Sequence, residues 1–397
     1  MTAGEEGPDT AVELSIVMPC LNEARTLGAC IRKAHQFLER SGISSEIIVA
    51  DNGSTDGSAE LAASLGARVV SVDCRGYGAA LAGGIKAARG SLVVMGDSDD
   101  SYDFSALQPL VDRLRAGDDL VLGNRYRGGI AAGAMPFLHR YVGNPLLSWW
   151  VRVVVGVPLR DVYCGLRGVR RAAIDGLDLK SSGMEFALEM IVKSKMLGMR
   201  VSEVPTTLAR DGRDRPPHLN TWRDGRRSLL LFLGSMPQVP FLYPGLALIL
   251  LGTVVGAVLT VRPISIARVH LDVHTLLYCG VAVLVGFQLV AYSVVLRFLM
   301  VSAGLLPARP GVPEWADRLR IEHGLGAGGG LLAAGLAALG WLLRTWEARG
   351  FGDLDPFLTM RLAIPSATAI ALGVELIFAA LFLSLAKWHV RTQRENR

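Results

Sequence analysis

Four long apolar runs constrain this chain more than any other feature. They cover about residues 238–261, 275–300, 325–343 and 362–386. Each is close to the roughly 20 residues that an α-helix needs to cross a bilayer. With 51% hydrophobic and only 19% charged residues, the 397-residue chain is too long and too apolar for one ordinary soluble domain. The sequence therefore predicts a polar front region followed by an all-α domain of four transmembrane helices.

The flanking charges predict how such a membrane domain is oriented. The first ten residues, MTAGEEGPDT, are acidic and polar without an apolar centre, so we expect no signal peptide and a cytoplasmic front region. Basic residues accumulate before the first apolar run and after the last, which favours both ends on the cytoplasmic side of the inner (cell) membrane in a multi-pass protein. These residues are Arg210, Arg213, Arg215, Arg223, Arg226 and Arg227 before the first run, and Lys387, Arg391, Arg394 and Arg397 after the last.

Composition and spacing disfavour several classes of function. The five cysteines show no CxxC spacing, which supports neither a zinc site nor a disulfide framework. The basic cluster adjoins a membrane segment and lacks the interleaved aromatics of a nucleic-acid stacking platform. The glycines of RGYGAALAGG (75–84) have the wrong spacing for GxGxxG, and no P-loop GK[ST] is present.

Apolar stretches alternate with helical patterns along the first 125 residues. The predicted strands are LSIVMP, EIIVAD, ARVVSVD, SLVVMGD and DLVLGNR, and the predicted helices cover about 24–40, 56–65, 78–89 and 104–116. This alternation is typical of an α/β domain with a parallel sheet and crossover helices. We therefore expect a disordered N-terminus (1–12), an α/β catalytic domain (13–217), a juxtamembrane helix (218–236), a transmembrane domain (237–390) and a cytoplasmic tail (391–397).

Polar motifs follow three of these strands. Pro19, Asn22 and Glu23 come after the first, DNGSTDGS (51–58) after the second and a group of acids (97–100) after the fourth. Each motif alone could be a turn or a helix cap. Because ligands bind beyond the carboxyl ends of strands in such sheets, the three loops together favour one binding site.

The acids in MGDSDDSYDF (95–104) predict a metal site. Asp97 and Asp99, separated by one residue at a strand end, can reach one divalent cation from the same side. Mg2+ and Mn2+ prefer such oxygen ligands and leave positions for substrate phosphates. A cation held there would neutralise a leaving diphosphate.

The order of motifs resembles that of the GT-A fold glycosyltransferases of family 2, and within them the polyprenyl-phosphate (dolichyl-phosphate) hexose synthases. The resemblance covers nearly the whole chain and ends in a basic juxtamembrane stretch and transmembrane helices. It rests on SIVMPCLNE, DNGSTDGS, RGYGAALAGGI, MGDSDDSYDF, LVLGNRYRGG, DVYCGLRGVRR and MEFALEMIVKSKMLGMRVSEVP.

The resemblance also implies roles for individual residues. Asp97 and Asp99 would hold the metal diphosphate, and Arg125 and Arg127 would meet the acceptor phosphate. Asp99, Asp97 and Arg125 are the implied catalytic residues. Asp161 and Arg167 match the family pattern in type and order. The implied nucleotide-binding residues are Pro19, Asn22, Glu23, Asp51, Asn52, Asp97 and Ser98.

The implied reaction moves a hexose from a nucleotide diphosphate sugar to polyprenyl phosphate, with inversion and with assistance from Mg2+ or Mn2+. The sequence has DSDDSYD where the mannose enzymes have a shorter DADxQ form, which favours a UDP-glucose-like donor over GDP-mannose. A GDP-mannose-dependent enzyme and a glycan-extending family 2 transferase are the alternative enzymes, although the QxxRW-type motif of the latter is absent. A transporter or flippase with a nucleotide-sensing domain is the nonenzymatic alternative.

The membrane-proximal segment HLNTWRDGRRSLLLFL (218–233) predicts an amphipathic helix in the membrane interface. Trp222, Leu229 and Leu233 fall on one side, with Arg223 and Arg227 beside them. These two arginines would lie where a lipid phosphate presents its head. The alternative is that the segment is only a basic stop at the cytoplasmic end of the first span.

Within the apolar runs, small residues favour helix packing: Gly252, Gly256, Gly326, Gly330, Ala334 and Ala338. Glu375 in the last run is compatible with a hydrogen bond between helices, including helices of two subunits in a homo-oligomer. A role in lipid handling is the less favoured alternative.

Overall fold

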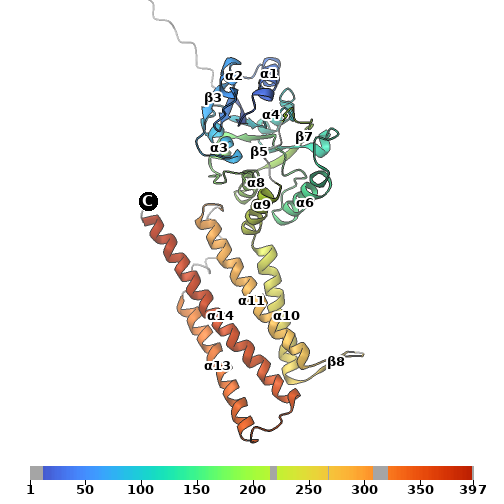
Figure 1. The fold of residues 1–397 in the computed structure, drawn as a ribbon, viewed down its shortest axis with the longest axis vertical. Helices are drawn as coiled ribbons and strands as arrows, with labels where there is room; N and C mark the ends of the chain where they lie inside the picture. The colour runs from blue at the N-terminus through green and yellow to red at the C-terminus, as the bar shows by residue number, and fades with distance from the viewer. Residues whose placement is uncertain (1–11, 215–220, 267, 307–320, 396–397) are drawn as a thin grey trace, which may run out of the picture. The chain divides into compact units, whose positions relative to one another are not determined.

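The structure, a computed structural model, describes residues 12–214, 221–266, 268–306 and 321–395. The chain divides into two compact units, Met1–Phe232 and Leu233–Arg397. The division falls inside helix α9 (Thr221–Ser235), so most of the segment expected as a juxtamembrane helix belongs to the first unit. Figure 1 labels several elements of each unit.

A seven-stranded sheet forms the centre of the first unit. Its strand order is β3-β2-β1-β4-β6-β5-β7. The strands are β1 (Leu14–Cys20), β2 (Ser45–Asp51), β3 (Arg68–Ser71), β4 (Leu92–Met95), β5 (Leu120–Asn124), β6 (Arg167–Arg170) and β7 (Val201–Pro205). The five strands expected from the sequence are all present as β1 to β5.

The five expected strands run in the same direction, as predicted, and the whole sheet is mixed because β6 runs the other way. Strand β6 lies between β4 and β5 and is antiparallel to both, with Met95 opposite Arg167 and Leu120 opposite Val169. Strand β7 is parallel to β5 at the edge of the sheet. Because β6 has only four residues and its charged ends interrupt the apolar run, it carries no clear pattern of alternation.

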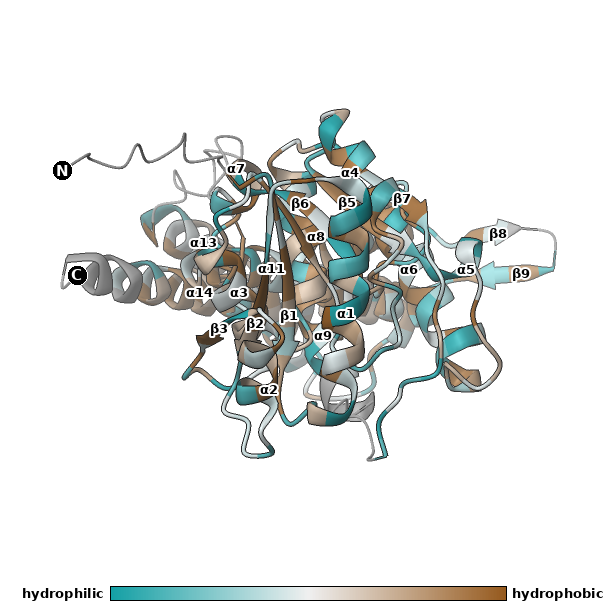
Figure 2. Cartoon of the chain, turned by 90° about the horizontal axis from the view of Figure 1, so that it is seen from above, coloured by the Kyte–Doolittle hydropathy of each residue, from teal (hydrophilic) through white to brown (hydrophobic). Residues whose placement is uncertain are grey.

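Helices cover the sheet, and their apolar side chains form the hydrophobic core together with those of the strands. They are α1 (Ala24–Ser41), α2 (Ser58–Ser64), α3 (Tyr77–Ala87), α4 (Gln108–Arg115), α5 (Arg125–Gly128), α6 (Asn144–Val154), α7 (Arg171–Asp175) and α8 (Phe186–Met196). Strand β1 is buried along its whole length, and in Figure 2 it has the brown of hydrophobic residues. Leu27, Ile31 and Phe104 pack with it in one core. Burial of such side chains stabilises the unit by about 1.5–3 kcal/mol each.

The second unit consists of long helices. They are η2 (Gln238–Leu242), α10 (Tyr243–Val261), α11 (Val273–Ser302), α13 (Ile321–Glu347) and α14 (Pro356–Glu395), with a small hairpin of β8 (Ile264–Ile266) and β9 (Val269–Leu271) after α10. Four helical segments have the length and hydropathy to cross a membrane: Gln238–Val261, Val273–Ser302, Ile321–Glu347 and Pro356–Trp388. An α/β domain followed by four membrane-length helices agrees with the predicted architecture.

Small residues bring these helices together, although not all at the expected positions. A Cβ at Gly252 would lie 2.7 Å from the carbonyl oxygen of Cys279, so α10 and α11 pack closely there. On α13, Gly328 and Gly335 face α14 in the same way, whereas a Cβ at Gly326 or Gly330 would meet nothing within 4 Å. The expectation for Gly326 and Gly330 is therefore wrong, because they lie on another face of α13 than Gly328.

Glu375 of α14 makes a contact between helices. The Nε2 group of Gln288 in α11 donates a hydrogen bond of 2.7 Å to Oε1 of Glu375. A direct polar bond of this kind stabilises helix association in an apolar environment by about 1 kcal/mol.

Candidate active site

The polar motifs lie together at one edge of the sheet. Strands β2, β1 and β4 are neighbours and parallel, so their carboxyl ends meet, with Cys20 opposite Asp51 in the register. The Ser98 hydroxyl donates a 2.6 Å hydrogen bond to the carbonyl oxygen of Pro19, which links the ends of β1 and β4. The residues expected to bind nucleotide therefore share one edge.

Several of these side chains hold their own loops in this structure. Asp51 accepts hydrogen bonds from the backbone N–H groups of Gly53 and Ser54. The Asn52 amide donates to the carbonyl oxygens of Val72 and Cys74, at 2.8 Å each. Asp51 and Asn52 thus fix the shape of the turn after β2.

The Asn22 side chain accepts a hydrogen bond of 2.8 Å from the backbone N–H of Thr55. Asn22 itself adopts a left-handed conformation with φ of 59°, and Asp100 does the same with φ of 64°. This conformation is uncommon outside glycine, although Asn and Asp tolerate it best. The chain therefore turns sharply after β1 and again after the acidic motif.

Asp97 is half-buried at the end of β4. Its Oδ1 accepts a hydrogen bond of 2.8 Å from the hydroxyl of Tyr77, the first residue of α3. Burial and the nearby negative charge of Asp99 together raise the pKa of Asp97 to about 6, although the hydrogen bond from Tyr77 acts to lower it. A Cβ at position 165 would lie 2.5 Å from Oδ2 of Asp97, so Gly165 leaves room for this carboxylate.

Asp99 is buried and already has partners at both carboxylate oxygens. Oδ1 accepts hydrogen bonds from the backbone N–H and the hydroxyl of Ser101. Oδ2 pairs with the guanidinium of Arg213, which also lies 3.2 Å from Oε1 of Glu23. The carboxylates of Glu23, Asp97 and Asp99 form what we call the acidic edge. It holds the guanidinium of Arg213 between Glu23, which follows β1, and Asp99, which follows β4.

This donor set fits a divalent cation with few protein ligands. Asp97 and Asp99 lie close enough that the charge of Asp99 disfavours ionisation of Asp97, and a bound cation would remove this penalty. Within the described ranges, no group of three or more His, Cys, Asp or Glu side chains could hold a metal. Water and diphosphate oxygens would complete the coordination, as Mg2+ usually requires. Arg213 would have to leave Oδ2 of Asp99.

Arg125 lies beneath the end of β5 in a buried ion pair. Its Nε and Nη2 atoms donate to Oδ2 and Oδ1 of Asp161, both at 2.7 Å, and its backbone N–H donates to the same carboxylate. The Asp161 side chain is fully buried and that of Arg125 is 9% exposed. In this arrangement the Arg125 guanidinium orients the loop and does not point freely toward a ligand.

The other predicted arginines divide into exposed and structural ones. Arg127 is exposed, and its side chain makes no hydrogen bond or ion pair with another described residue. Arg227 on α9 is also exposed, whereas the side chain of Arg223 lies outside the described residues. Arg167 is buried and donates to the carbonyl oxygens of Cys164, Val162 and Ala187. Arg167 therefore holds β6 against the neighbouring backbone and does not face a ligand.

Sequence reasoning missed two side chains of this site, Tyr77 and Arg213. In the sequence Arg213 is one of the basic residues that favour the membrane orientation. The clustering of the acids Glu23, Asp97 and Asp99 indicates that a basic side chain should lie beside them, and this could have pointed to Arg213. Tyr77 lies in RGYGAALAGG, where only the glycines were weighed.

An exposed apolar surface on the first unit was missed as well. It comprises Phe137, Leu138, Tyr141, Leu146, Trp149 and Val153, from the π-helical turn η1 (His139–Gly143), the residues before it and α6. Trp150 contacts Phe232 of α9 with ring centroids 5.7 Å apart, so α6 and α9 pack together within this unit.

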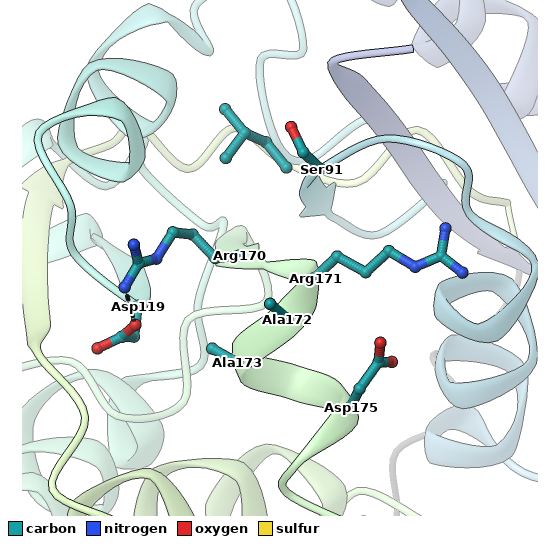
Figure 3. Close-up of a pocket in the computed structure, with 8 residues that line it drawn as sticks. Ser91, Asp119, Arg170, Arg171, Ala172, Ala173 and Asp175 are labelled. Atoms are coloured by element: carbon teal, nitrogen blue, oxygen red, sulfur yellow. Dashed lines mark hydrogen bonds and ion pairs between the residues drawn. The ribbon is translucent and has the colours of Figure 1, made fainter. Parts of the chain in front are cut away.

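A separate hollow lies at the other end of the strands from the acidic edge. It is lined by Ser91, Leu92, Asp119 and the start of α7, where Arg170 pairs with Asp119 (Figure 3). Leu92 begins β4 and Arg170 ends the antiparallel β6, so this hollow lies at the amino end of β4. It therefore belongs to the other side of the domain from the acidic edge.

Comparison with known proteins identifies the chain's family. The family model of glycosyl transferase family 2 matches residues 15–176, and that of the glycosyltransferase family 2 C-terminal transmembrane region matches residues 294–387. The low-salt glycan biosynthesis hexosyltransferase Agl6 of Haloferax volcanii is 34% identical over 380 residues, which cover 94% of this chain and 89% of the relative. The chain belongs to glycosyltransferase family 2.

Other relatives of this family 2 glycosyltransferase match its front unit. A dolichyl-phosphate hexose transferase of Haloferax volcanii is 29% identical over 194 residues, covering 49% of this chain and 81% of the relative. Among solved structures, glucosyl-3-phosphoglycerate synthase of Mycobacterium tuberculosis has a TM-score of 0.46 and 26% identity over 56% of this chain and 80% of that one. The membrane-length helices and the transmembrane family model together make this glycosyltransferase a membrane protein.

Proposed function

We propose that this family 2 glycosyltransferase moves a hexose from a nucleotide diphosphate sugar, with a UDP-glucose-like donor favoured, to polyprenyl phosphate. The observation that carries the proposal is the acidic edge that holds the cationic Arg213 between Asp99 and Glu23, in a chain with four membrane-length helices. Such an edge suits the cation of a metal diphosphate. The lipid acceptor is supported by the similarity to a dolichyl-phosphate hexose transferase.

The donor would bind along the ends of β1, β2 and β4. Asp97 and Asp99 would hold Mg2+ or Mn2+, which when bound neutralises the departing nucleoside diphosphate. Pro19, Asn22 and Glu23 would lie beside the nucleotide together with the turn that Asp51 and Asn52 fix. Ser98 holds the end of β4 against β1 and so positions both acids.

The lipid phosphate is already anionic near neutral pH and needs no general base. Its oxygen attacks the anomeric carbon from the face opposite the leaving group, a carbon–oxygen bond forms, and the bond to the diphosphate breaks. The electron pair leaves with the nucleoside diphosphate, and the anomeric configuration inverts. Catalysis then rests on alignment and on charge stabilisation at the acidic edge.

Arginines would meet the acceptor. Arg127 is exposed and presents a guanidinium suited to phosphate. Arg125, held by Asp161, would position the loop that carries Arg127. Arg223 and Arg227 on α9 would attract the lipid phosphate at the membrane surface, each worth on the order of 1 kcal/mol. An even number of crossings would place the catalytic unit and the end of α14 on the same, cytoplasmic side.

Incubation of the purified full-length protein with radiolabelled nucleotide sugars and a polyprenyl phosphate tests this function. We expect label in the extracted lipid as a lipid-linked monosaccharide, strongest with UDP-glucose. Label only from GDP-mannose would identify a mannose synthase. Label only in a longer glycan would identify a glycan-extending transferase, and absence of any lipid product would overturn the proposal.

A further inference from the structure

The exposed apolar surface of η1 and α6, which we call the η1–α6 surface, lies along one continuous helical stretch. The turn η1 ends at Gly143 and α6 begins at Asn144, both in helical conformation. The opposite side of α6 packs into the first unit through Ser148 and Val151. The exposed apolar residues recur at intervals of three and four, which is one side of a helix. They are Leu138, Val142, Leu146, Trp149 and Val153, with Phe137 and Tyr141 beside them.

The exposed apolar side chains of the first unit are concentrated around this surface. Among the described residues of the unit, Leu197 at the end of α8 is the one large exposed apolar side chain that lies elsewhere. The others belong to the η1–α6 surface or to two neighbouring helices, as Tyr126 of α5 and Leu229 and Leu230 of α9. Helices α6 and α9 are in contact through Trp150 and Phe232 (Figure 1). An exposed apolar patch of this extent marks an interaction site.

The charges around the surface have one sign. Residues 126–160 contain four arginines and no Asp or Glu. The guanidinium carbon of Arg140 lies 5.3 Å from the ring centre of Tyr141, and Arg226 and Arg227 of α9 are exposed. Two copies of this surface placed face to face would bring like charges together, which disfavours a dimer formed through it. An anionic lipid surface complements both the basic charges and the apolar side chains.

The chain itself keeps this surface close to a bilayer. The first membrane-length segment begins at Gln238, six residues after Phe232. Six residues span at most about 22 Å even when fully extended. Because Phe232 contacts Trp150 with ring centroids 5.7 Å apart, α6 is tethered to a membrane segment by a short connection. Tyr and Trp, which the surface exposes, are the residues that membrane interfaces favour.

Tyr126 connects the surface to α5. Its hydroxyl donates a hydrogen bond of 2.9 Å to the carbonyl oxygen of Arg140 in η1. The same short helix carries the exposed Arg127. A bound partner that fixes η1 would therefore also fix the helix that presents Arg127.

We propose that the η1–α6 surface docks into the headgroup region of an anionic bilayer as a second point of attachment for the first unit, besides its covalent link to the membrane segments. Its apolar side chains would enter the boundary between headgroups and acyl chains, and Arg140 would face the lipid phosphates. The docking does not depend on the reaction. One consequence, which rests on the proposed function, is that α5 holds Arg127 at the level of the phosphate of a lipid acceptor.

Nitroxide accessibility in the full-length protein tests the docking. Labels at Val153→Cys and Leu197→Cys form a matched pair, because both side chains are apolar and exposed and only Val153 lies on the surface. Both variants carry Cys74→Ser, since Cys74 is the exposed cysteine of the described residues. Oxygen partitions into lipid, whereas a charge-neutral nickel chelate stays in water. In nanodiscs that contain anionic phospholipid, we expect the ratio of oxygen to nickel collisions to be at least about threefold higher at position 153 than at position 197.

Trp149→Asp places a charge on the surface at an exposed position, so the fold should be kept. In this variant the collision ratio at position 153 should fall to that at position 197, while the Tm in detergent stays unchanged. Equal ratios at the two positions without the Asp substitution would overturn the docking. Low accessibility of position 153 to both reagents, with dipolar broadening between labels, would assign the surface to a second copy of the chain and overturn it as well.

Transfer kinetics in the same nanodiscs test the link to α5. Trp149→Asp should raise the KM for polyprenyl phosphate about tenfold and leave the Kd for the nucleotide sugar unchanged. An unchanged KM would overturn the placement of Arg127 at the lipid surface. If the protein without substitutions transfers nothing to a lipid phosphate, the proposed function fails, whereas the collision ratios still decide the docking.

Discussion

The guanidinium of Arg213 pairs with the carboxylate of Asp99, although the two residues lie 114 positions apart in the sequence. The pair joins the segment that leads to α9 to the end of β4. Both side chains are largely shielded from solvent, at 15% and 9% exposure. The charge balance of the acidic edge therefore depends on where this segment lies.

Replacement of Arg213 by Ala is expected to destabilise the metal-free protein. It leaves the buried carboxylates of Asp99 and Glu23 without their shared cation, which should cost about 2 kcal/mol. Thermal unfolding in EDTA should show a lower Tm, and Mn2+ should raise the Tm of the variant more than that of the unmodified protein. Arg25→Ala is the control, because Arg25 pairs with Asp214 at the exposed surface and should change stability little. An unchanged Tm in EDTA would contradict the role of Arg213.

Asp99→Asn is expected to abolish transfer and to leave expression and membrane insertion intact. The amide can keep the contact with Ser101 but loses the charge for the metal diphosphate, so the rate should fall at least about a hundredfold. The measurement is transfer with Mg2+ or Mn2+ at saturating donor. Asp100→Asn is a matched control beside it, since Asp100 pairs with Lys33. Full activity of Asp99→Asn would refute the assignment.

Arg127→Ala should weaken use of the lipid phosphate without harming the fold. Loss of one charged hydrogen bond predicts a rise of about tenfold in the KM for the acceptor. Titration calorimetry should give an unchanged Kd for the nucleotide sugar. An equal loss of donor affinity would move Arg127 to the diphosphate.

Arg125→Ala should behave differently from Arg127→Ala because it strands the fully buried carboxylate of Asp161. Loss of one member of a buried pair costs about 3–5 kcal/mol. We expect a lower Tm and poor expression, which a thermal scan of the detergent-solubilised protein measures. A stable Arg125→Ala variant with selective loss of acceptor use would show that Arg125 contacts the phosphate directly.

Glu46 provides a test of pH dependence away from the site. Burial acts to raise the pKa of Glu46, but hydrogen bonds from the backbone N–H of Arg89, from Ser15 and from Arg68 outweigh it and lower the pKa. A lowered pKa means that the contribution to stability is present above the unfolded-state value of 4.5 and is lost as the pH falls through the folded-state value. Glu46→Gln should therefore lower the Tm at pH 7 but not at pH 3. If Glu46→Gln lowers the Tm equally at pH 7 and pH 3, ionisation of Glu46 is excluded as the cause.

Much of the fold could be predicted because its signals are local. Buried strands such as β1 and β2 are apolar runs that end in polar loops, and parallel order brings those loops to one edge. The four membrane-length helices follow from length and hydropathy alone. The family resemblance rested on the order of motifs, and the comparisons confirm it.

The remaining features depend on contacts between distant parts of the chain. Strand β6 is too short to show a pattern, and its place between β4 and β5 is set by pairing partners. In the sequence Arg213 is one of several flanking charges and Arg125 is an expected acceptor-phosphate residue, and only the folded chain pairs them with Asp99 and Asp161. Gly328 and Gly326 have the same local composition, and helix rotation alone decides which faces α14.

The antiparallel strand β6 has a consequence for how the protein is made. Strand β6 is the link between β4 and β5. Strand β5 therefore cannot join the rest of the sheet until β6, which ends at Arg170, has left the ribosome. Strand β7 then adds to β5 before the first membrane-length helix begins at Gln238. The catalytic unit can thus close in the order of synthesis, and a delay in pairing β6 would leave two half-sheets exposed just as apolar helices begin to emerge.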